Sequence, residues 1–75
     1  MSVIDQKTGN GAFSVSVDGA EVAVSIESDD PRTFMSARHA YDWCKSGYAD
    51  LAGTMRGFSY LNACFALEDH MECAA

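Results

Sequence analysis

The stretch FSVSVDGAEVAVSI, residues 13–26, decides the fold. Two runs of alternating apolar and small or polar side chains flank an Asp-Gly pair. Alternation with a period of two is typical of a strand with one buried face. Asp-Gly between two such runs favours a tight type I′ turn, because both central residues of that turn need a positive φ. The segment therefore predicts an antiparallel β-hairpin.

The turn also predicts how the two strands pair. A loop at residues 18–19 gives three pairs, namely Val17 with Ala20, Val15 with Val22 and Phe13 with Val24. All of these side chains point to one face, so the turn and the apolar pattern select the same register. An isolated hairpin is barely stable in water. A third strand is therefore expected at residues 2–5, connected through a turn at residues 8–11.

Two helical regions are expected after the hairpin. Asp29-Asp30-Pro31 places an Asp at the N-cap and Pro at the first helical position, so the first helix is predicted from Pro31 to about Ser46. Gly47 is expected to end it. Residues 48–73 are expected to form one long helix, or two pieces with a break near Gly57. The fold class is therefore α+β: a hairpin or three-stranded sheet followed by two or three helices, in the order β-β-α-α.

The second helical region is apolar on two nearly opposite sides. One stripe contains Leu51, Met55, Phe58, Leu61 and Phe65. The other contains Tyr60, Cys64, Leu67 and Met71, and three of these, Tyr60, Leu67 and Met71, are the expected interface of a homodimer. The expected core consists of Val15, Val22, Val24, Phe34, Tyr41, Leu51, Phe58 and Phe65.

Length and composition limit the function classes. The 75 residues form one domain (1–75), and eleven of the apolar residues are alanines. A chain of this size is marginally stable, which favours association with a partner. The first ten residues resemble no secretory leader, and no apolar run approaches the roughly 20 residues that span a bilayer. We expect a cytoplasmic protein with three free cysteines and no membrane partner.

The net charge of −6 is concentrated in two acidic clusters. The first comprises Glu27, Asp29 and Asp30, and the second comprises Glu68, Asp69 and Glu72. If the helices are antiparallel, the two clusters are expected to meet as one negative pole that binds a partner. Trp43 lies on the polar side of the first predicted helix and is a further partner-binding candidate, because Trp is enriched among interface hot spots. The alternatives are a solvated acidic end and a Trp that covers the edge of the hairpin or packs under the second helix.

Catalytic and metal-binding patterns are weak. His70 and Cys73 form one close ligand pair, which could bind a metal with Cys44, Cys64 or His39. Zinc sites usually show two close pairs, so we expect no metal and no cofactor. His39 and Cys44 are five residues apart and do not face each other on a helix. A chain this short rarely holds a pocket of about 300 Å³, so no enzymatic activity is expected.

Five basic residues against eleven acids provide no patch for direct nucleic-acid binding. The expected function is therefore a small acidic binding protein that inhibits a larger, nucleic-acid-handling protein complex through a basic surface. This format is typical of phage-encoded inhibitors of bacterial defence, including anti-CRISPR proteins, and no residue motif carries the similarity; such a protein would act in the host cytoplasm. The alternatives are a homo-oligomeric structural or adaptor protein and a metal-binding regulator that uses Cys and His.

Overall fold

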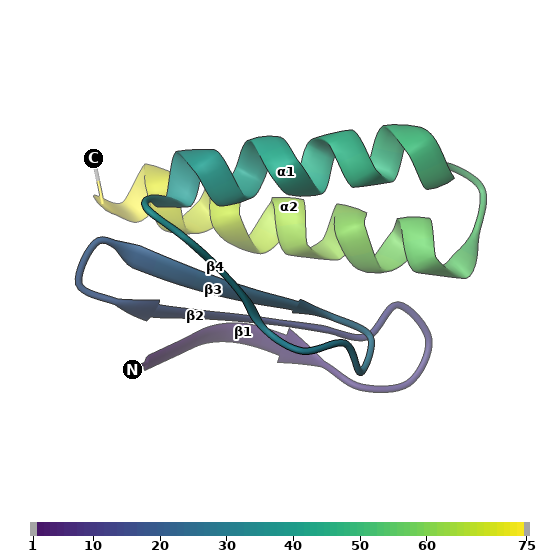
Figure 1. Ribbon diagram of the computed structural model, residues 1–75, viewed down its shortest axis with the longest axis horizontal. Helices are drawn as coiled ribbons and strands as arrows, with labels where there is room; N and C mark the ends of the chain where they lie inside the picture. Colours follow the sequence, from purple (N-terminus) through teal and green to yellow (C-terminus); the bar gives the residue numbers. More distant parts are fainter. Residues whose placement is uncertain (1, 75) are drawn as a thin grey trace.

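Four antiparallel strands form a meander, and two helices follow them (Figure 1). In the computed structural model, which describes residues 2–74, the strands are β1 (Ser2–Lys7), β2 (Phe13–Asp18), β3 (Glu21–Ile26) and β4 (Arg32–Phe34). The spatial order of the strands is their order in the chain. The α+β class, the hairpin and the strand before it are confirmed, while the order becomes β-β-β-β-α-α because of β4.

The predicted register of the hairpin is wrong by two residues. The observed pairs are Val17 with Val22, Val15 with Val24 and Phe13 with Ile26. The loop is Gly19–Ala20, and only Gly19 has a positive φ (64°), which is the pattern of a type II′ turn. A shift of two residues keeps the same side chains on the same face. The apolar face was therefore predicted correctly although the turn was not.

The start of the first helix was also predicted wrongly. Residues 29–31 form a loop, and Arg32–Phe34 then pair with β3 as a fourth strand. Helix α1 (Ala37–Leu51) begins six residues later than the Asp-Pro pattern indicated, because Ser36 provides the N-cap. The Ser36 hydroxyl accepts a hydrogen bond from the backbone N–H of His39 at 3.3 Å.

Neither predicted helix boundary at a glycine is present. Helix α1 continues through Gly47 to Leu51, and the chain turns at Gly53, where φ is +87°. Helix α2 (Met55–Ala74) then runs without a break at Gly57. Gly47 serves a different purpose, because a Cβ there would lie 2.5 Å from the Tyr60 ring. It permits the close approach of the two helices.

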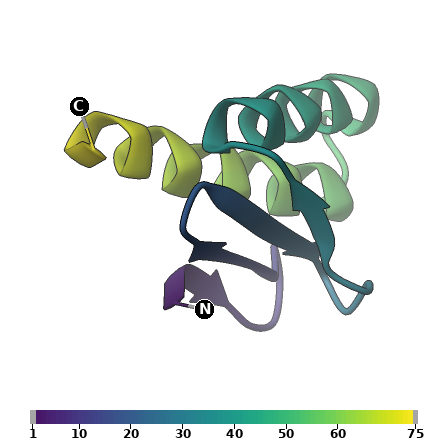
Figure 2. The same cartoon turned by 60° about the vertical axis from the view of Figure 1, so that its left-hand side comes forward.

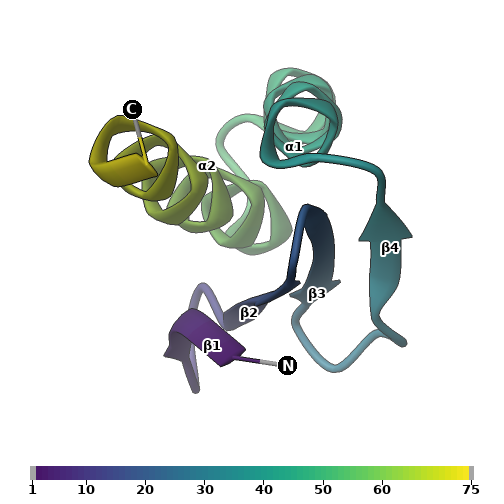
Figure 3. The ribbon, with the colours of Figure 1, turned by 90° about the vertical axis from the view of Figure 1, so that its left-hand side faces the viewer.

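Both helices cover one face of the sheet. Helix α1 contacts β3 and β4, while α2 contacts β1, β2 and β3 (Figures 2 and 3). The core between the layers consists of Phe13, Val15, Val22, Val24, Ile26, Ala40, Cys44, Tyr60, Ala63, Cys64, Ala66 and Leu67. The opposite face of β2 and β3 carries Ser14, Ser16, Ala23 and Ser25, all partly exposed. Within residues 2–74, neither helix combines the length and the apolar character that a membrane crossing requires.

The predicted core is only partly confirmed. Val15, Val22 and Val24 are buried, and Phe34, Tyr41 and Leu51 pack against the core while remaining partly exposed. Phe58 and Phe65 were expected inside, yet they are 50% and 57% exposed. The side of α2 that faces the sheet carries alanines instead, which allow the helix to lie close to it.

Candidate protein-interaction surface

The loop between β3 and β4, residues 27–31, is held in a fixed shape. Glu27 adopts a φ of 58°, which is unusual for a residue other than glycine. Its N–H donates to the Ala12 carbonyl at 2.9 Å, and the Ser25 hydroxyl donates to the Asp29 carbonyl at 2.6 Å. These bonds direct the carboxylates of Glu27 and Asp29 toward the start of α2.

Arg56, in the first turn of α2, pairs with both of these carboxylates. Its guanidinium donates to Asp29 and lies 3.7 Å from the Glu27 carboxylate. The hydrogen bond to Asp29 raises the pKa of Arg56 above its usual value. The first acidic cluster is therefore partly neutralised within the chain, and only Asp30 makes no salt bridge among the described residues.

The two acidic clusters do not meet, contrary to the prediction. Arg56 and Glu68 are twelve residues apart on one helix, which corresponds to roughly 18 Å at 1.5 Å per residue. Figure 1 shows the loop after β3 at the end of the molecule where α2 begins, while α2 ends at the other. The cause is β4, because this strand carries the chain from that loop across the sheet to the start of α1.

One side of α2, turned away from α1 and from the core, carries large apolar and acidic side chains. We define the outer face of α2 as Phe58, Leu61, Phe65, Glu68, Asp69 and Glu72. Residues seven apart on a helix lie within about 20° of one another, so Phe58, Phe65 and Glu72 follow one line along it. Met55, at the start of the helix, is 51% exposed and extends the apolar part of this face.

The acidic end of the outer face is not neutralised within the chain. Across residues 2–74, no salt bridge involves Glu68, Asp69 or Glu72, and all three are exposed. Carboxylates in the last turns of a helix are unfavourable, because that end carries the negative pole of the helix dipole. The second acidic cluster thus differs from the first, in which Glu27 and Asp29 pair with Arg56.

Trp43 is partly buried and packs within the fold. Its ring lies 5.4 Å from that of Phe34 and 5.2 Å from that of Tyr60, in the latter case edge to face. The guanidinium of Arg32 lies 5.3 Å from the Trp43 ring and covers it from the β4 side. A hollow of about 240 Å³ beside these groups is also lined by Asp30. Trp43 thus joins both helices to the sheet and is partly covered by a cation of its own chain.

The stripe expected to form a dimer interface lies mostly inside the fold. Leu67 is fully buried and Tyr60 almost so, while Met71 is partly exposed. These side chains pack against the sheet and α1 because they occupy the side of α2 that faces the core. The exposed large apolar side chains that remain for association include Phe58 and Phe65 on the outer face of α2, besides Val3, Met35 and Met55.

The Cys and His candidates do not gather at one site. Cys44 and Cys64 are buried, and the hydrogen bond between their thiols, with burial, raises the pKa of Cys44. The same hydrogen bond lowers the pKa of Cys64. Cys73 is exposed, and His39 Nδ1 lies 2.9 Å from the Ser36 hydroxyl. Within residues 2–74, no group of three or more His, Cys, Asp or Glu side chains could hold a metal ion.

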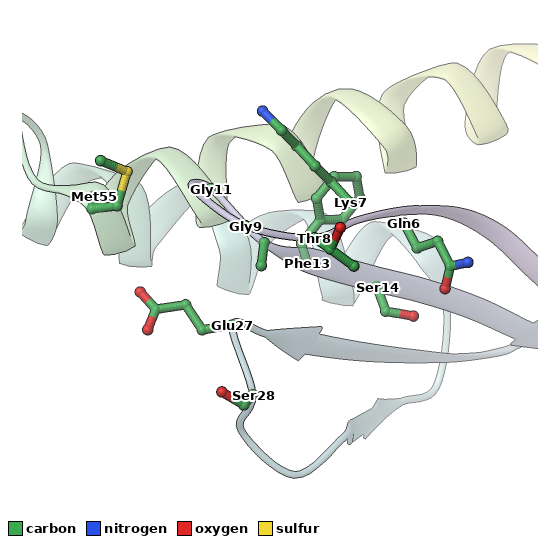
Figure 4. Close-up of a pocket in the computed structure, with 11 residues that line it drawn as sticks. Gln6, Lys7, Thr8, Gly9, Gly11, Phe13, Ser14, Glu27, Ser28 and Met55 are labelled. Carbon is green, nitrogen blue, oxygen red and sulfur yellow. The ribbon is translucent and has the colours of Figure 1, made fainter.

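A hollow lies where the loops after β1 and β3 meet the start of α2 (Figure 4). It has a volume of about 640 Å³ and includes Glu27, Met55 and the glycines at 9 and 11. The Lys7 side chain extends from it toward α2. Its lining offers the hydroxyl groups of Thr8, Ser14 and Ser28 and two opposite charges, Lys7 and Glu27.

Sequence reasoning assigned Phe58 and Phe65 to the core and so missed them as surface residues. The signal that could have placed them is the run of small residues, Ala63 and Ala66, on another side of the same helix. Comparison with known proteins adds nothing to this surface, because no family model, curated protein or solved structure matches the chain.

Proposed function

We propose that this protein binds a basic surface of a larger, nucleic-acid-handling protein through the outer face of α2, and that it inhibits that protein. The observation that carries the proposal is the combination, on one helix side, of two phenylalanines that are each at least half exposed with three carboxylates that no salt bridge neutralises among residues 2–74. The proposal assigns no chemical step to the chain.

The two parts of the outer face have different roles in this binding. Phe58 and Phe65 are the anchors, because buried aromatic side chains supply most of the energy of an interface. Their burial also removes from water the largest exposed apolar groups of the helix. Glu68, Asp69 and Glu72 steer the encounter and accept hydrogen bonds from arginines of the partner.

The inhibitory role follows from the kind of surface that such carboxylates fit. A groove that binds nucleic acid is lined with Arg and Lys that neutralise phosphates. Carboxylates satisfy the same side chains, and a net charge of −6 attracts them over a distance. A protein bound there through α2 would occupy the place of the nucleic acid.

The test begins with identification of a partner by affinity capture from the native host and mass spectrometry. Binding is then measured by calorimetry for the wild type, for Phe65→Ala and for a triple variant. The triple variant combines Glu68→Lys, Asp69→Lys and Glu72→Lys. We expect Phe65→Ala to weaken binding at least about tenfold. The triple variant should also weaken binding and reduce its salt dependence, because it removes steering charges.

A matched control separates position from net charge. The control variant replaces three other exposed acids by Asp18→Lys, Glu21→Lys and Asp50→Lys. It changes the net charge by the same amount, from −6 to 0. The proposal requires this control to keep most of its affinity. Equal losses in the two triple variants, or normal binding by Phe65→Ala, would place the interface elsewhere. If the captured protein still binds nucleic acid in the presence of this chain, the inhibitory role is overturned.

A further inference from the structure

The outer face of α2 overlooks the edge of the sheet at β1. Among the described residues, β1 pairs only with β2, so its other edge has no neighbour. Figure 3 shows β1 at the side of the sheet that lies below α2. A groove of about 300 Å³ runs between this strand and the helix, and it is lined by Asp5, Gln6, Lys7, Phe13, Asn62 and Phe65.

The hairpin determines which backbone groups of β1 are used inside the sheet. The two-residue loop makes Asp18 and Glu21 the hydrogen-bonded pair that closes the turn. Hydrogen-bonded and non-hydrogen-bonded pairs alternate along antiparallel strands, so every second residue of β2 turns its N–H and C=O toward β1. These residues are Phe13, Val15 and Val17.

Two residues of β1 therefore present their backbone groups to the unpaired edge. Ser2, Asp5 and Lys7 pair with the inward-turned residues of β2, which leaves Val3 and Gln6 turned outward. A separate observation agrees, since the Gln6 N–H donates to the Asp5 carboxylate at 2.8 Å and not to a strand. This edge can accept main-chain hydrogen bonds from an added strand.

The outer face of α2 extends beyond β1, the edge strand of the sheet. Phe65 lines the groove beside β1 and is still 57% exposed, while Ile4 is the only residue of β1 that is even partly buried. Neighbouring strands lie about 4.8 Å apart. A strand added to β1 would lie below the outer face and turn every second side chain toward the helix layer, where Phe65 lies.

We infer that an extended segment of a partner protein, with alternating apolar and basic side chains, binds as a fifth strand along β1 and covers Phe65. This inference rests on the proposed function for the nature of the partner and names the way in which it is recognised. Asp5, which lines the groove, and the exposed Asp69, one helical turn after Phe65, favour basic side chains beside this edge, while the groove's own lining also includes the cation Lys7. A second copy of the chain would bring the same carboxylates and the same net negative charge, so it fits this edge less well.

The experiment uses a displayed library of ten-residue peptides in which β-branched residues alternate with Lys, Arg, Gln or Ser. Peptides enriched on the wild-type chain are measured against Gln6→Pro and Gln6→Ala. Proline is tolerated at an edge strand where the N–H faces outward, and at position 6 it removes the donor that bonds to the Asp5 carboxylate in the free chain and that the added strand would use. We expect Gln6→Pro to weaken binding at least about tenfold and Gln6→Ala to change it little.

Hydrogen exchange gives a second measurement that needs no variant. The amides of Val3 and Gln6 should become protected when an enriched peptide binds, while circular dichroism checks that Gln6→Pro remains folded. Enrichment of no peptide, equal affinity of the two Gln6 variants, or unchanged exchange at both amides would overturn the inference. Self-association in light scattering that Gln6→Pro abolishes would show that the strand comes from a second copy, which also overturns it.

The two proposals fail in different ways. In one outcome, the captured partner binds Phe65→Ala more weakly but binds Gln6→Pro normally. The outer face of α2 would then be the interface, and strand addition would be rejected. In the other outcome, the enriched peptides require the Gln6 N–H, while the captured partner binds the outer-face variants as tightly as the wild type. This result would support the strand site and reject the proposed function.

Discussion

The two sides of α2 are both apolar in sequence, yet the fold treats them in opposite ways. The inner side carries Leu67, which is fully buried, and alanines at 63 and 66 that contact the core. The outer side carries Phe58 and Phe65, which are larger and at least half exposed. Size therefore does not decide which side is buried. The helix lies close to the sheet through its small residues and leaves its aromatic residues outside.

The comparison shows how the two layers reach contact. A sheet face made of Val, Ile and Phe already fills much of the space between the layers, so a helix with small residues fits against it. Gly47 of α1 extends the same rule to the helix pair, because its missing side chain makes room for the Tyr60 ring. The inner side should therefore be sensitive to every change in volume, and the outer side should not.

The largest expected effect comes from truncating one large side chain on each side of α2. Leu67→Ala should lower the free energy of unfolding by about 2–5 kcal/mol, because it leaves a cavity in the core. Phe65→Ala, its matched control, should change stability by less than about 1 kcal/mol, since most of this ring is in water. Urea unfolding followed by circular dichroism measures both. Similar losses in the two variants would mean that the outer face supports the fold.

A smaller effect on the free energy of unfolding is expected at Gly47, where two contributions have opposite signs. Helix propensity alone predicts that Gly47→Ala stabilises by about 1 kcal/mol. The added Cβ would lie 2.5 Å from the Tyr60 ring, and overpacking of this kind costs about 1–3 kcal/mol. We expect a net loss in chemical denaturation, and a smaller loss when Tyr60→Leu is also present. A gain in stability from Gly47→Ala would show that the helices are farther apart than described.

The smallest effect is expected at Ser59, on the inner side of α2. Its hydroxyl is fully buried and has no hydrogen-bond partner within the described residues. Removing an unsatisfied buried hydroxyl and gaining helix propensity should make Ser59→Ala more stable by about 1 kcal/mol. Thermal unfolding by calorimetry would show this as a higher Tm. A lower Tm would mean that the hydroxyl is hydrogen-bonded in solution.

The sequence was sufficient for the parts of the fold that depend on a short-range pattern. The alternation in residues 13–26 identified two strands and their buried face, and residues 2–5 were correctly expected to pair with them. It was insufficient for β4, since three residues are too few to show alternation. Asp29-Asp30-Pro31 also resembles a helix start, whereas the actual N-cap is the inconspicuous Ser36.

The error at β4 also explains why the acidic site was predicted poorly. Without this strand, the loop at 27–30 would precede α1 and lie near the end of α2. With it, Glu27 and Asp29 lie at the start of α2 and pair with Arg56, an interaction over 27 residues or more that no local pattern reports. The second acidic cluster required no such knowledge, because Glu68, Asp69 and Glu72 simply continue a helix that the sequence predicted.

The meander topology has a consequence for how the chain reaches its fold. Every strand pairs with its neighbour in sequence, and the two helices that pack together are also consecutive. Contacts between near neighbours close small loops, so the sheet and the helix pair can each form rapidly. The slow step is then the docking of one on the other, which must join β2 to α2, whose nearest ends, Asp18 and Met55, are 37 residues apart in the chain. Until it occurs, the Val-rich face of the sheet is open to water and prone to aggregation.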